Sequence, residues 1–385
     1  MPSTITSANS IFSDFGINEF LSGTTTVTGG GYIIAGTSGF NALVLGNGVQ
    51  ASTYTVNIDG AVMSFGTNSS FGDGIVVTDV ATADINIGRT GVVYGRFNAI
   101  EAFGQTDLVN AGSISSNSGD PTIRFGFSDG SSTWGNTLVN QETGRIANDQ
   151  GVAVIYDSTG AHILNNRGVI SAGAGFITVW APQDSAETIT NSGVFTSGMV
   201  LGLGNDSVDT RLGRIDGIVD MGDGKDRYLG GSGVDNVVGG EGADTLRGFG
   251  GNDVLSGGGD SDILIGGLGA DTLTSGFGNN NLFQYFSITE STVAAAGRDT
   301  ITDYSSAADS IDMHFIDANA VLAGNNAFTL FVGPGAFTGL GQIRAVQSGA
   351  DAIVQFNTTG STAADMSILL LGTSAAGLTF GDFIA

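Results

Sequence analysis

The chain has 385 residues and is strongly acidic, with 37 aspartates and glutamates against 12 lysines and arginines and a net charge of −25. Because nucleic acids and anionic membranes are bound through basic faces, this charge argues against both as partners. Cysteine is absent, so no disulfide stabilises the chain, and no apolar run approaches the ~18 residues that a membrane-spanning helix needs. With 64 glycines, four prolines and 41% apolar residues, the composition predicts many short strands joined by tight turns rather than disorder.

Residues 1–30 are polar and rich in threonine and serine, apart from a short apolar patch at residues 11–20. We expect them to cap the N-terminal end of the fold that follows. The start of the chain has no basic region followed by an apolar stretch, so it does not predict an N-terminal secretion signal. If the protein is exported, we expect the signal to lie elsewhere.

Residues 31–220 contain a loose repeat in which an apolar residue, any residue and asparagine are followed by glycine and an apolar strand. The pattern is typical of a right-handed parallel β-helix, with short strands on each rung and turns at fixed corners. The recurring asparagine predicts an internal ladder of side-chain amides. A β-sandwich of similar strands is the alternative. The phrase resembles rungs of bacterial surface β-helices such as autotransporter passengers. Its glycines, the last four separated by 24, 25 and 24 residues, are Gly60, Gly91, Gly112, Gly144, Gly168, Gly193 and Gly217.

Residues 221–283 are seven consecutive nine-residue units with the pattern G-G-x-G-x-D-x-U-x, where U is a large apolar residue. Glycines at positions 1, 2 and 4 let the backbone turn tightly and aim carbonyl oxygens into a loop. Position 6 adds a carboxylate, and position 8 gives each short strand one inward side chain. Ca²⁺ selects such hard oxygen ligands, and no sulfur or imidazole cluster is present for a softer metal. A flexible linker would not place an apolar residue at every eighth position, so the unit predicts calcium sites.

The unit resembles the nonapeptide repeat of RTX proteins, which form a calcium-dependent parallel β-roll. The resemblance implies that two units make one turn and that loops two units apart stack and hold an ion, giving about five ions in total. The implied pairs are Asp226 with Asp244, Asp235 with Asp253, Asp244 with Asp262, Asp253 with Asp271, and Asp262 with Asn280. The loop glycines assigned to the same sites are Gly231, Gly233, Gly240, Gly242, Gly251, Gly258, Gly267 and Gly269.

Two of the departures from the repeat pattern bear on the expected metal sites. Asp260 replaces the glycine at position 4, and Asn280 carries no charge at position 6, so we expect the last site to be weaker. Upstream, residues 201–209 (LGLGNDSVD) match the unit in all but the first glycine and place Asp206 at the metal position. We therefore expect a further ion at Asp206, and a β-helix that leads directly into the β-roll.

Residues 284–385 contain fewer glycine pairs and more aromatic residues. The stretch 283–319 and the closing LTFGDFIA resemble the C-terminal domain of serralysin-type proteases. The resemblance implies a β-rich domain after the β-roll with a type I secretion signal at its end, where the acidic residue and apolar tail correspond to residues 382–385. Four aspartates are consistent either with a further calcium site or with capping and solvation: Asp299, Asp303, Asp309 and Asp312.

No catalytic motif is found. Serralysins carry the zinc motif H-E-x-x-H-x-x-G-x-x-H, but neither His162 nor His314 has a neighbouring glutamate, so protease activity is not implied. Residues 126–130 match the G-x-S-x-G pattern of a nucleophile elbow around Ser128, but no helical periodicity follows.

A β-helix enzyme that cleaves or epimerises acidic polysaccharides remains an alternative. Such an enzyme needs a base and cationic residues, and Arg145, Arg167, Tyr94 and Tyr156 are available. They do not converge in the sequence. Trp134 and Trp180 offer aromatic surfaces for sugars, although packing at a rung corner is the more common role of such residues.

The sequence thus predicts an extracellular all-β protein without catalytic function, in which a parallel β-helix leads into a calcium β-roll and a C-terminal β-rich domain. We expect it to be exported by type I machinery and to self-associate in a calcium-dependent way as a structural or adhesive component of the cell surface or biofilm matrix. The open edge of a parallel solenoid can template another strand, and a head-to-tail contact need not close. A polysaccharide-active enzyme and a monomeric carbohydrate-binding adhesin remain alternatives.

Overall fold

The fold is described from a computed structural model. The residues described are 3–5, 11–13, 23–35, 41–46, 52–66, 72–79, 81–127 and 131–385. Most of the predicted N-terminal cap, residues 1–30, and the serine of the G-x-S-x-G motif, Ser128, lie outside the described residues. The chain divides into two compact units, residues 1–219 and 220–385. Among the described residues, no helix is long and apolar enough to cross a lipid bilayer.

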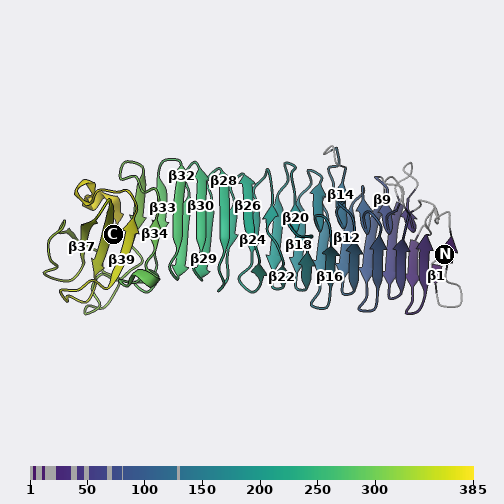
Figure 1. The fold of residues 1–385 in the computed structure, drawn as a ribbon, viewed down its shortest axis with the longest axis horizontal. Coiled ribbons are helices and arrows are strands. Elements are labelled where there is room, and N and C mark those ends of the chain that lie inside the picture. The colour runs from purple at the N-terminus through teal and green to yellow at the C-terminus, as the bar shows by residue number, and fades with distance from the viewer. Residues whose placement is uncertain are drawn as a thin grey trace. The chain divides into compact units, whose positions relative to one another are not determined.

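The first unit is a parallel β-helix (Figure 1). Each full rung contributes one strand to each of three parallel sheets, here named A, B and C. Sheet A contains β1 (Ser3–Ile5), β3 (Gly23–Val27), β6 (Ser52–Ile58), β9 (Ala81–Ile87), β12 (Thr106–Asn110), β15 (Thr137–Asn140), β18 (His162–Asn166), β21 (Glu187–Asn191) and β24 (Ser207–Asp209).

Sheets B and C complete the rungs. Sheet B contains β2 (Ile11–Ser13), β4 (Tyr32–Ala35), β7 (Ala61–Ser64), β10 (Val92–Gly95), β13 (Ser113–Ser116), β16 (Arg145–Asn148), β19 (Val169–Ser171), β22 (Val194–Phe195) and β25 (Arg214–Ile215). Sheet C contains β5 (Leu43–Leu45), β8 (Ile75–Val77), β11 (Ile100–Ala102), β14 (Ile123–Gly126), β17 (Val154–Asp157), β20 (Val179–Trp180) and β23 (Met199–Val200).

The core of the β-helix consists of apolar side chains stacked from rung to rung. Alternate residues of a strand point inward, as the burial pattern of β12 shows. Because the strands pair in parallel and in register, each inward residue lies on the equivalent residue of the next rung. The row through sheet A is no more than 1% exposed and consists of Ile85, Leu108, Leu138, Leu164, Ile189 and Val208.

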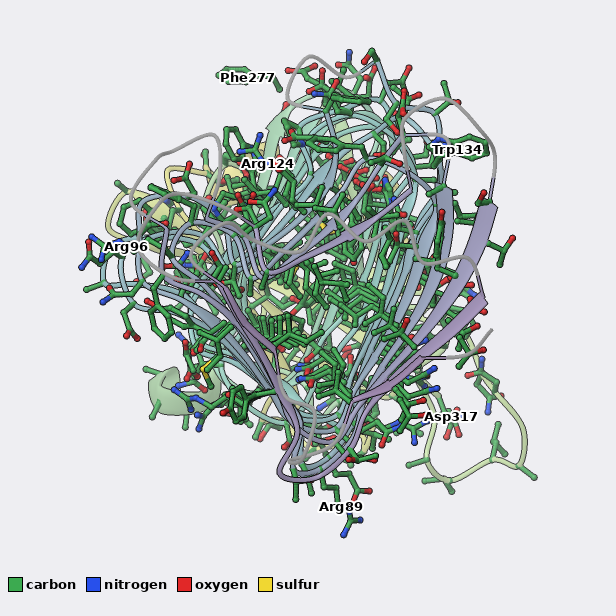
Figure 2. The ribbon with its side chains drawn as sticks, turned by 90° about the vertical axis from the view of Figure 1, so that its right-hand side faces the viewer. Arg89, Arg96, Arg124, Trp134, Phe277 and Asp317 are labelled. Atoms are coloured by element: carbon green, nitrogen blue, oxygen red, sulfur yellow. The ribbon has the colours of Figure 1, made fainter. Side chains whose placement is uncertain are left out.

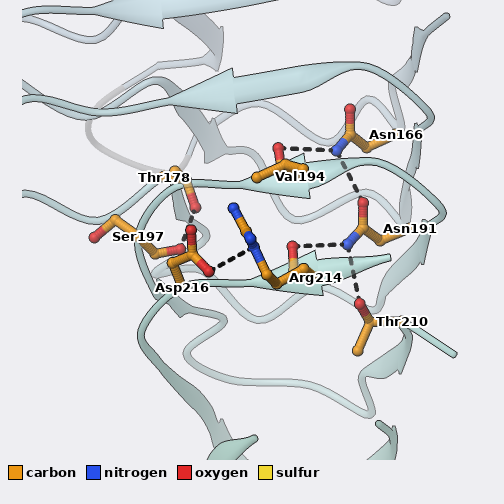
Figure 3. A network of polar contacts seen from close by, with 8 residues as sticks. All are labelled: Asn166, Thr178, Asn191, Val194, Ser197, Thr210, Arg214 and Asp216. Atoms are coloured by element: carbon orange, nitrogen blue, oxygen red, sulfur yellow. Dashed lines mark hydrogen bonds and ion pairs between the residues drawn. The ribbon is translucent and has the colours of Figure 1, made fainter. Parts of the chain in front are cut away.

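The predicted asparagine ladder is confirmed. The side-chain amide of Asn110 donates to Oδ1 of Asn140 at 2.9 Å, Asn140 to Asn166 at 2.8 Å, and Asn166 to Asn191 at 2.9 Å. Asn191 closes the ladder on the hydroxyl of Thr210 at 2.9 Å (Figure 3). All four amides are buried, and each also donates to a backbone carbonyl. They therefore fix the corner between sheets A and B without leaving a polar group unpaired.

Glycine at this corner lets successive rungs approach closely. A Cβ on Gly112, Gly168 or Gly193 would overlap the backbone of the preceding rung. In the last copy of the β-helix repeat, RLGRIDGIVD, the prediction of Gly217 as the corner glycine was wrong. Gly213, which donates to the carbonyl of Thr210 just before β25, occupies the corner, whereas Gly217 follows β25.

The second unit begins as a β-roll of two parallel sheets. Roll sheet 1 contains β27 (Arg227–Leu229), β29 (Thr245–Gly250), β31 (Ile263–Leu268), β33 (Asn281–Gln284), β35 (Asp309–Asp312) and β40 (Phe383–Ile384). Roll sheet 2 contains β26 (Ile218–Asp223), β28 (Asn236–Glu241), β30 (Val254–Gly259), β32 (Thr272–Phe277), β34 (Thr300–Ile301), β39 (Met366–Leu370), β38 (Asp351–Asn357), β37 (Gln342–Ser348) and β36 (Leu330–Phe331).

The C-terminal part of this unit is built on the same two sheets. An antiparallel meander of β37, β38 and β39 extends roll sheet 2, and β40 pairs in parallel with β35 through Ile311 and Phe383. Three single-turn 3-10 helices lie in the connections: η1 (Ala295–Gly297), η2 (Ala375–Gly377) and η3 (Phe380–Asp382).

Candidate metal centre

The nine-residue units build two stacks of loops, one at each edge of the β-roll. The apolar residue at position 8 points inward, and Tyr228, Val237, Leu246, Leu255, Leu264 and Leu273 are fully buried. Strands pair with the strand two units later, for example Leu246 with Leu264 and Leu255 with Leu273. The glycine-rich part of each unit then forms the loop that joins the two sheets. Loops two units apart therefore stack, as predicted.

The glycines of positions 2 and 4 permit this stacking. Gly258 and Gly269 have φ angles of 117° and 152°, which glycine adopts without steric cost. The carbonyl oxygen of the preceding turn occupies the place where a Cβ would lie. Asp260, the predicted departure at position 4, adopts a φ of 65°, a left-handed conformation that aspartate tolerates better than most residues.

The aspartates of position 6 form a ladder inside each loop stack. The backbone N–H of Asp226 donates to Oδ1 of Asp244 at 2.8 Å, and Asp244 donates in the same way to Asp262 at 2.9 Å. On the other edge, Asp235 donates to Asp253 at 2.9 Å and Asp253 to Asp271 at 2.8 Å. All of these side chains are buried. One oxygen of each later carboxylate is thus fixed by the preceding turn.

The second carboxylate oxygen, Oδ2, is buried in Asp244, Asp253, Asp262 and Asp271 and has no hydrogen-bond partner among the described residues. In the units of Asp244, Asp253 and Asp262, this oxygen faces a space above the position-1 glycine. A Cβ added to Gly239, Gly248 or Gly257 would overlap the Oδ2 atom five residues later and lie 2.5, 2.7 and 2.8 Å from a carbonyl oxygen of the next turn. Carboxylate and carbonyl oxygens therefore converge in one small cradle, the donor set that a calcium ion requires.

Burial disfavours ionisation of these carboxyl groups when no cation is bound. It raises the pKa of Asp244 and Asp253 to about 7, and that of Asp262 and Asp271 to about 6. Burial is the largest cause because the carboxylate loses its hydration. Neighbouring aspartates add like-charge repulsion, as Asp226 and Asp262 do at Asp244. A divalent cation between the loops would remove both penalties.

Backbone carbonyls must supply most of the ligands. Among the described residues, no group of three or more histidine, cysteine, aspartate or glutamate side chains is arranged to hold a metal. Each loop instead contributes one aspartate and its carbonyl oxygens. Such an all-oxygen set suits calcium and offers nothing to a soft metal.

Comparison with protein families agrees with this geometry. The profile of the RTX calcium-binding nonapeptide repeat (4 copies) matches residues 222–255, 229–264 and 247–282. Residues 222–282 carry RTX calcium-binding repeats. A search of curated proteins finds no match.

Among solved structures, the chain is similar to the solution structure of the AlgE6R3 subunit from the Azotobacter vinelandii mannuronan C5-epimerase. That match has 22% sequence identity, covers 44% of this chain and 79% of that subunit, and has a TM-score of 0.23.

The loop of the second unit, which carries Asp235, differs from the later ones. Both oxygens of Asp235 have protein partners, since Oδ1 accepts from the hydroxyl of Tyr228 and Oδ2 from the N–H of Gly231, each at 3.0 Å. Asp235 therefore lacks the open oxygen of the later repeats, and Asp253 is the better ligand of the predicted pair. The other loop glycines assigned to the metal all have positive φ angles: Gly240, Gly242, Gly251, Gly258, Gly267 and Gly269.

In the last RTX unit the predicted residue is wrong by one position. Asn281, not Asn280, is buried and accepts the N–H of Asp262 at 2.8 Å. Asn280 is exposed and has a φ of 68°, which takes up one extra residue in the turn. The inward side chain shifts accordingly from Leu282 to Phe283, which pairs with Leu264.

The ladder continues beyond the repeats. The N–H of Asp271 donates to Oδ1 of Asp299 at 3.0 Å, and the amide of Asn281 donates to Oδ1 of Asp309 at 3.1 Å. Asp299 is fully buried, and burial raises its pKa to about 8. The signal was present in the sequence, because RDTIT around Asp299 matches the D-T-apolar core of units such as ADTLT.

Asp206, at which the sequence predicts a further ion, lies in the β-helix, the compact unit of residues 1–219. It is buried, and its Oδ1 accepts the N–H of Glu187 at 2.7 Å. This is the same backbone-to-carboxylate bond that the roll repeats. A calcium ion at Asp206 stays a prediction.

The residues considered for catalysis do not form a site. Tyr156 is fully buried, stacking on Phe125 and His162 with ring centroids 5.2 and 4.4 Å apart. Burial lowers the pKa of His162 to about 4. Arg145 lies in β16 of sheet B, and Arg167 lies in the turn after β18. Tyr156 faces the interior from sheet C, so the structure does not bring it together with Arg145 and Arg167.

Proposed function

We propose that the protein is a secreted calcium-binding structural component of the cell surface or biofilm matrix, which folds outside the cell and self-associates when calcium is bound. The observation that carries this proposal is the row of buried Oδ2 atoms of Asp244, Asp253, Asp262 and Asp271, for which the described part of the chain offers no hydrogen-bond partner. A fold that buries several such oxygens is completed by cations, so ion binding becomes folding energy.

Export before folding follows from the same requirement. Free calcium is scarce in the cytosol and abundant outside cells, so the repeats stay unfolded and threadable until they emerge. The C-terminal tail is consistent with this order. Phe383 and Asp382 are buried in the folded unit, and the hydroxyl of Tyr304 donates to Oδ1 of Asp382 at 3.2 Å. A type I exporter would therefore recognise this tail before folding packs it away.

Removal of residues 378–385 tests the export step. We expect the truncated chain to remain inside the producing cell, while a variant with Phe277→Ser, at an exposed position at the end of β32, is exported normally. Normal export of the truncated chain would contradict the signal assignment.

Self-association is tested by electron microscopy of the purified chain with millimolar calcium and again with excess chelator. We expect ordered polymers in calcium that disperse in chelator, because the β-roll and any contact that depends on it lose their structure. Single particles at every calcium concentration would contradict self-association while leaving calcium binding to be measured by calorimetry.

A further inference from the structure

A second polar site lies on the outer face of sheet C in the β-helix. Its chemistry differs from that of the calcium loops. Parallel register places Glu101 beside Arg124, Arg124 beside Ile155, and Ile155 beside Trp180. Their strand neighbours point inward and are fully buried, as Phe125 is beside Arg124. Adjacent strands are about 4.8 Å apart, so Trp180 lies about 10 Å along the row from Arg124.

Two groups in this row have bonding capacity left over. The Nε atom of Arg124 is buried and has no partner among the described residues, while Nη1 lies 3.5 Å from Oδ2 of Asp157. The carboxyl group of Glu101 makes no hydrogen bond or ion pair with a described residue, and its side chain is partly buried. Buried polar groups normally have partners, which indicates that the Nε atom of Arg124 serves a ligand, and the carboxyl group of Glu101 on the neighbouring strand offers that ligand an acceptor.

Several carboxyl groups lie within electrostatic range of the Arg124 guanidinium. Oδ1 of Asp73 accepts the N–H of Asn98 at 3.0 Å. Burial raises the pKa of Glu101 to about 7 and that of Asp73 to about 6, and the charge of Asp73 acts further on Glu101. Asp120 contributes to the same field at both carboxyls. The site therefore combines several acceptors with one strong donor in partly desolvated surroundings.

The charges decide the class of ligand. The charge of Arg124 acts on the carboxyl groups of Asp73, Glu101 and Asp157, and Asp120 adds a further negative charge at the first two, so an anionic ligand such as a uronate would be repelled. A metal ion is disfavoured by Arg124, and no metal-binding cluster exists among the described residues. An uncharged molecule rich in hydroxyl groups fits, because hydroxyls donate to carboxyl oxygens and accept from a guanidinium.

The aromatic residue of the row supplies the remaining element of such a site. Trp180 is 41% exposed, and a flat indole face packs against the apolar face of a sugar ring while polar groups fix its orientation. We propose that the outer face of sheet C binds an uncharged polysaccharide, which stacks on Trp180 and is hydrogen-bonded by Glu101 and Arg124. This activity is separate from the proposed calcium-dependent assembly.

The chain provides its own probe, because it contains only two tryptophans, Trp134 and Trp180. Trp134 is 42% exposed but lies near the corner after sheet C, where its carbonyl accepts from the hydroxyl of Ser158, and Figure 2 shows it well to the side of Arg124. Trp134→Phe and Trp180→Phe are therefore matched variants. Each leaves one reporter, and neither residue belongs to the buried core.

The experiment measures intrinsic fluorescence and calorimetry of the full chain in calcium, titrated with cellohexaose, maltohexaose, xylohexaose, mannohexaose and hexagalacturonate. We expect at least one neutral oligosaccharide to bind and to change the emission of the Trp134→Phe variant. In Trp180→Ala and in Glu101→Gln, binding should weaken by about tenfold or more, the loss of one stacking or hydrogen-bonding contact. Trp134→Ala should bind as the unaltered chain does.

Three outcomes would overturn the proposal: no binding of any neutral member, binding of hexagalacturonate alone, or neutral binding that Trp180→Ala and Glu101→Gln leave unchanged. Circular dichroism of each variant confirms that the β-helix is folded, and the conservative Trp180→Phe variant retains a flat ring if alanine disturbs sheet C. None of these results depends on polymer formation.

Discussion

The β-helix and the β-roll connect successive rungs through the same kind of hydrogen bond, but with side chains of different charge. In both, the backbone N–H that begins one rung donates to a side chain of the next. In the β-helix, Thr106 donates to Oδ1 of Asn136 at 2.8 Å, and Asn136 donates to Nδ1 of His162 at 3.2 Å. In the roll, Asp226 and Asp244 make the corresponding bonds to carboxylates. The geometry is shared, but the charge is not.

The two ladders differ in the polar atoms that remain without a hydrogen-bond partner. The ladder of Asn110, Asn140, Asn166 and Asn191 pairs its donors and acceptors internally. An aspartate ladder cannot do this, because an ionised carboxylate has no donor, and its Oδ2 atom remains buried without a partner. A neutral ladder is therefore complete as folded, whereas a charged ladder requires a cation. This difference assigns the two regions opposite responses to calcium and to pH.

Calcium removal should produce the largest effect. In excess chelator the roll retains buried carboxylates that repel one another, on the order of 4 kcal/mol per close pair before salt screening. Several such pairs exceed the roughly 5–15 kcal/mol that stabilises a domain. We expect limited proteolysis to cleave within residues 220–385 while residues 81–219 stay protected. Equal protection of both regions in chelator would remove the distinction.

Exchanging the two ladder chemistries should give the next largest effect. Asn166→Asp places an unpaired charge at a fully buried position, and we expect a loss of about 3–5 kcal/mol in the free energy of unfolding of the β-helix. The loss should be independent of calcium. Thermal or denaturant unfolding followed by circular dichroism measures it, with Asn165→Asp on the outer side of the same strand as the control.

The reverse exchange tests the roll. Asp244→Asn with Asp253→Asn keeps the oxygen that accepts the backbone N–H but removes two buried charges. We expect the metal-free roll to gain structure, while calcium calorimetry shows fewer or weaker sites. If the double variant binds calcium unchanged, these aspartates are not ligands.

The pH dependence of the two regions should have opposite signs. In the metal-free roll, the pKa of Asp244 and Asp253 is raised to about 7, so stability rises as pH falls from about 7 toward the unfolded value near 3.9. In the β-helix, the pKa of His162 is lowered to about 4. Stability therefore falls between about pH 6.5 and 4, by on the order of 3 kcal/mol.

Melting curves in chelator between pH 4 and 8, assigned to each region by proteolysis, measure both trends. His162→Gln should flatten the β-helix trend and leave that of the roll unaltered. Parallel trends in the two regions would show that net charge, rather than the two sets of buried groups, controls the pH response.

The smallest effect is expected from Tyr156→Phe. The hydroxyl of Tyr156 is buried and has no hydrogen-bond partner in the part of the chain that the structure describes, so its removal should leave the unfolding free energy unchanged or slightly increased. The measurement is denaturant unfolding in calcium. A loss above about 1 kcal/mol would reveal a hydrogen bond of ordinary strength at this hydroxyl.

Short-range sequence patterns determine much of the β-roll and of the asparagine ladder. The nine-residue period identifies the strand positions, the loop glycines and the aspartates of the roll, because each unit contacts an equivalent unit. The asparagine of the β-helix phrase could be assigned to a ladder for the same reason: parallel strands in register repeat every contact, so one rung describes its neighbours.

Other features depend on how rungs align in space, which a local pattern does not encode. The extra residue in the last turn replaces Asn280 with Asn281, and only the pairing of Leu264 with Phe283 reveals the shift. Both carboxylate oxygens of Asp235 accept hydrogen bonds, one from Tyr228 and one from Gly231. This is a local packing detail.

The row that joins Glu101, Arg124 and Trp180 illustrates the same limit across longer separations. These residues lie on three rungs of unequal length, so their spacing in the sequence shows no period. Insertions at the rung corners change that spacing without changing the register of the strands, because hydrogen bonding and inward packing align the rungs. A periodic sequence therefore determines a repeated site, whereas a site assembled across irregular rungs is decided by the tertiary structure.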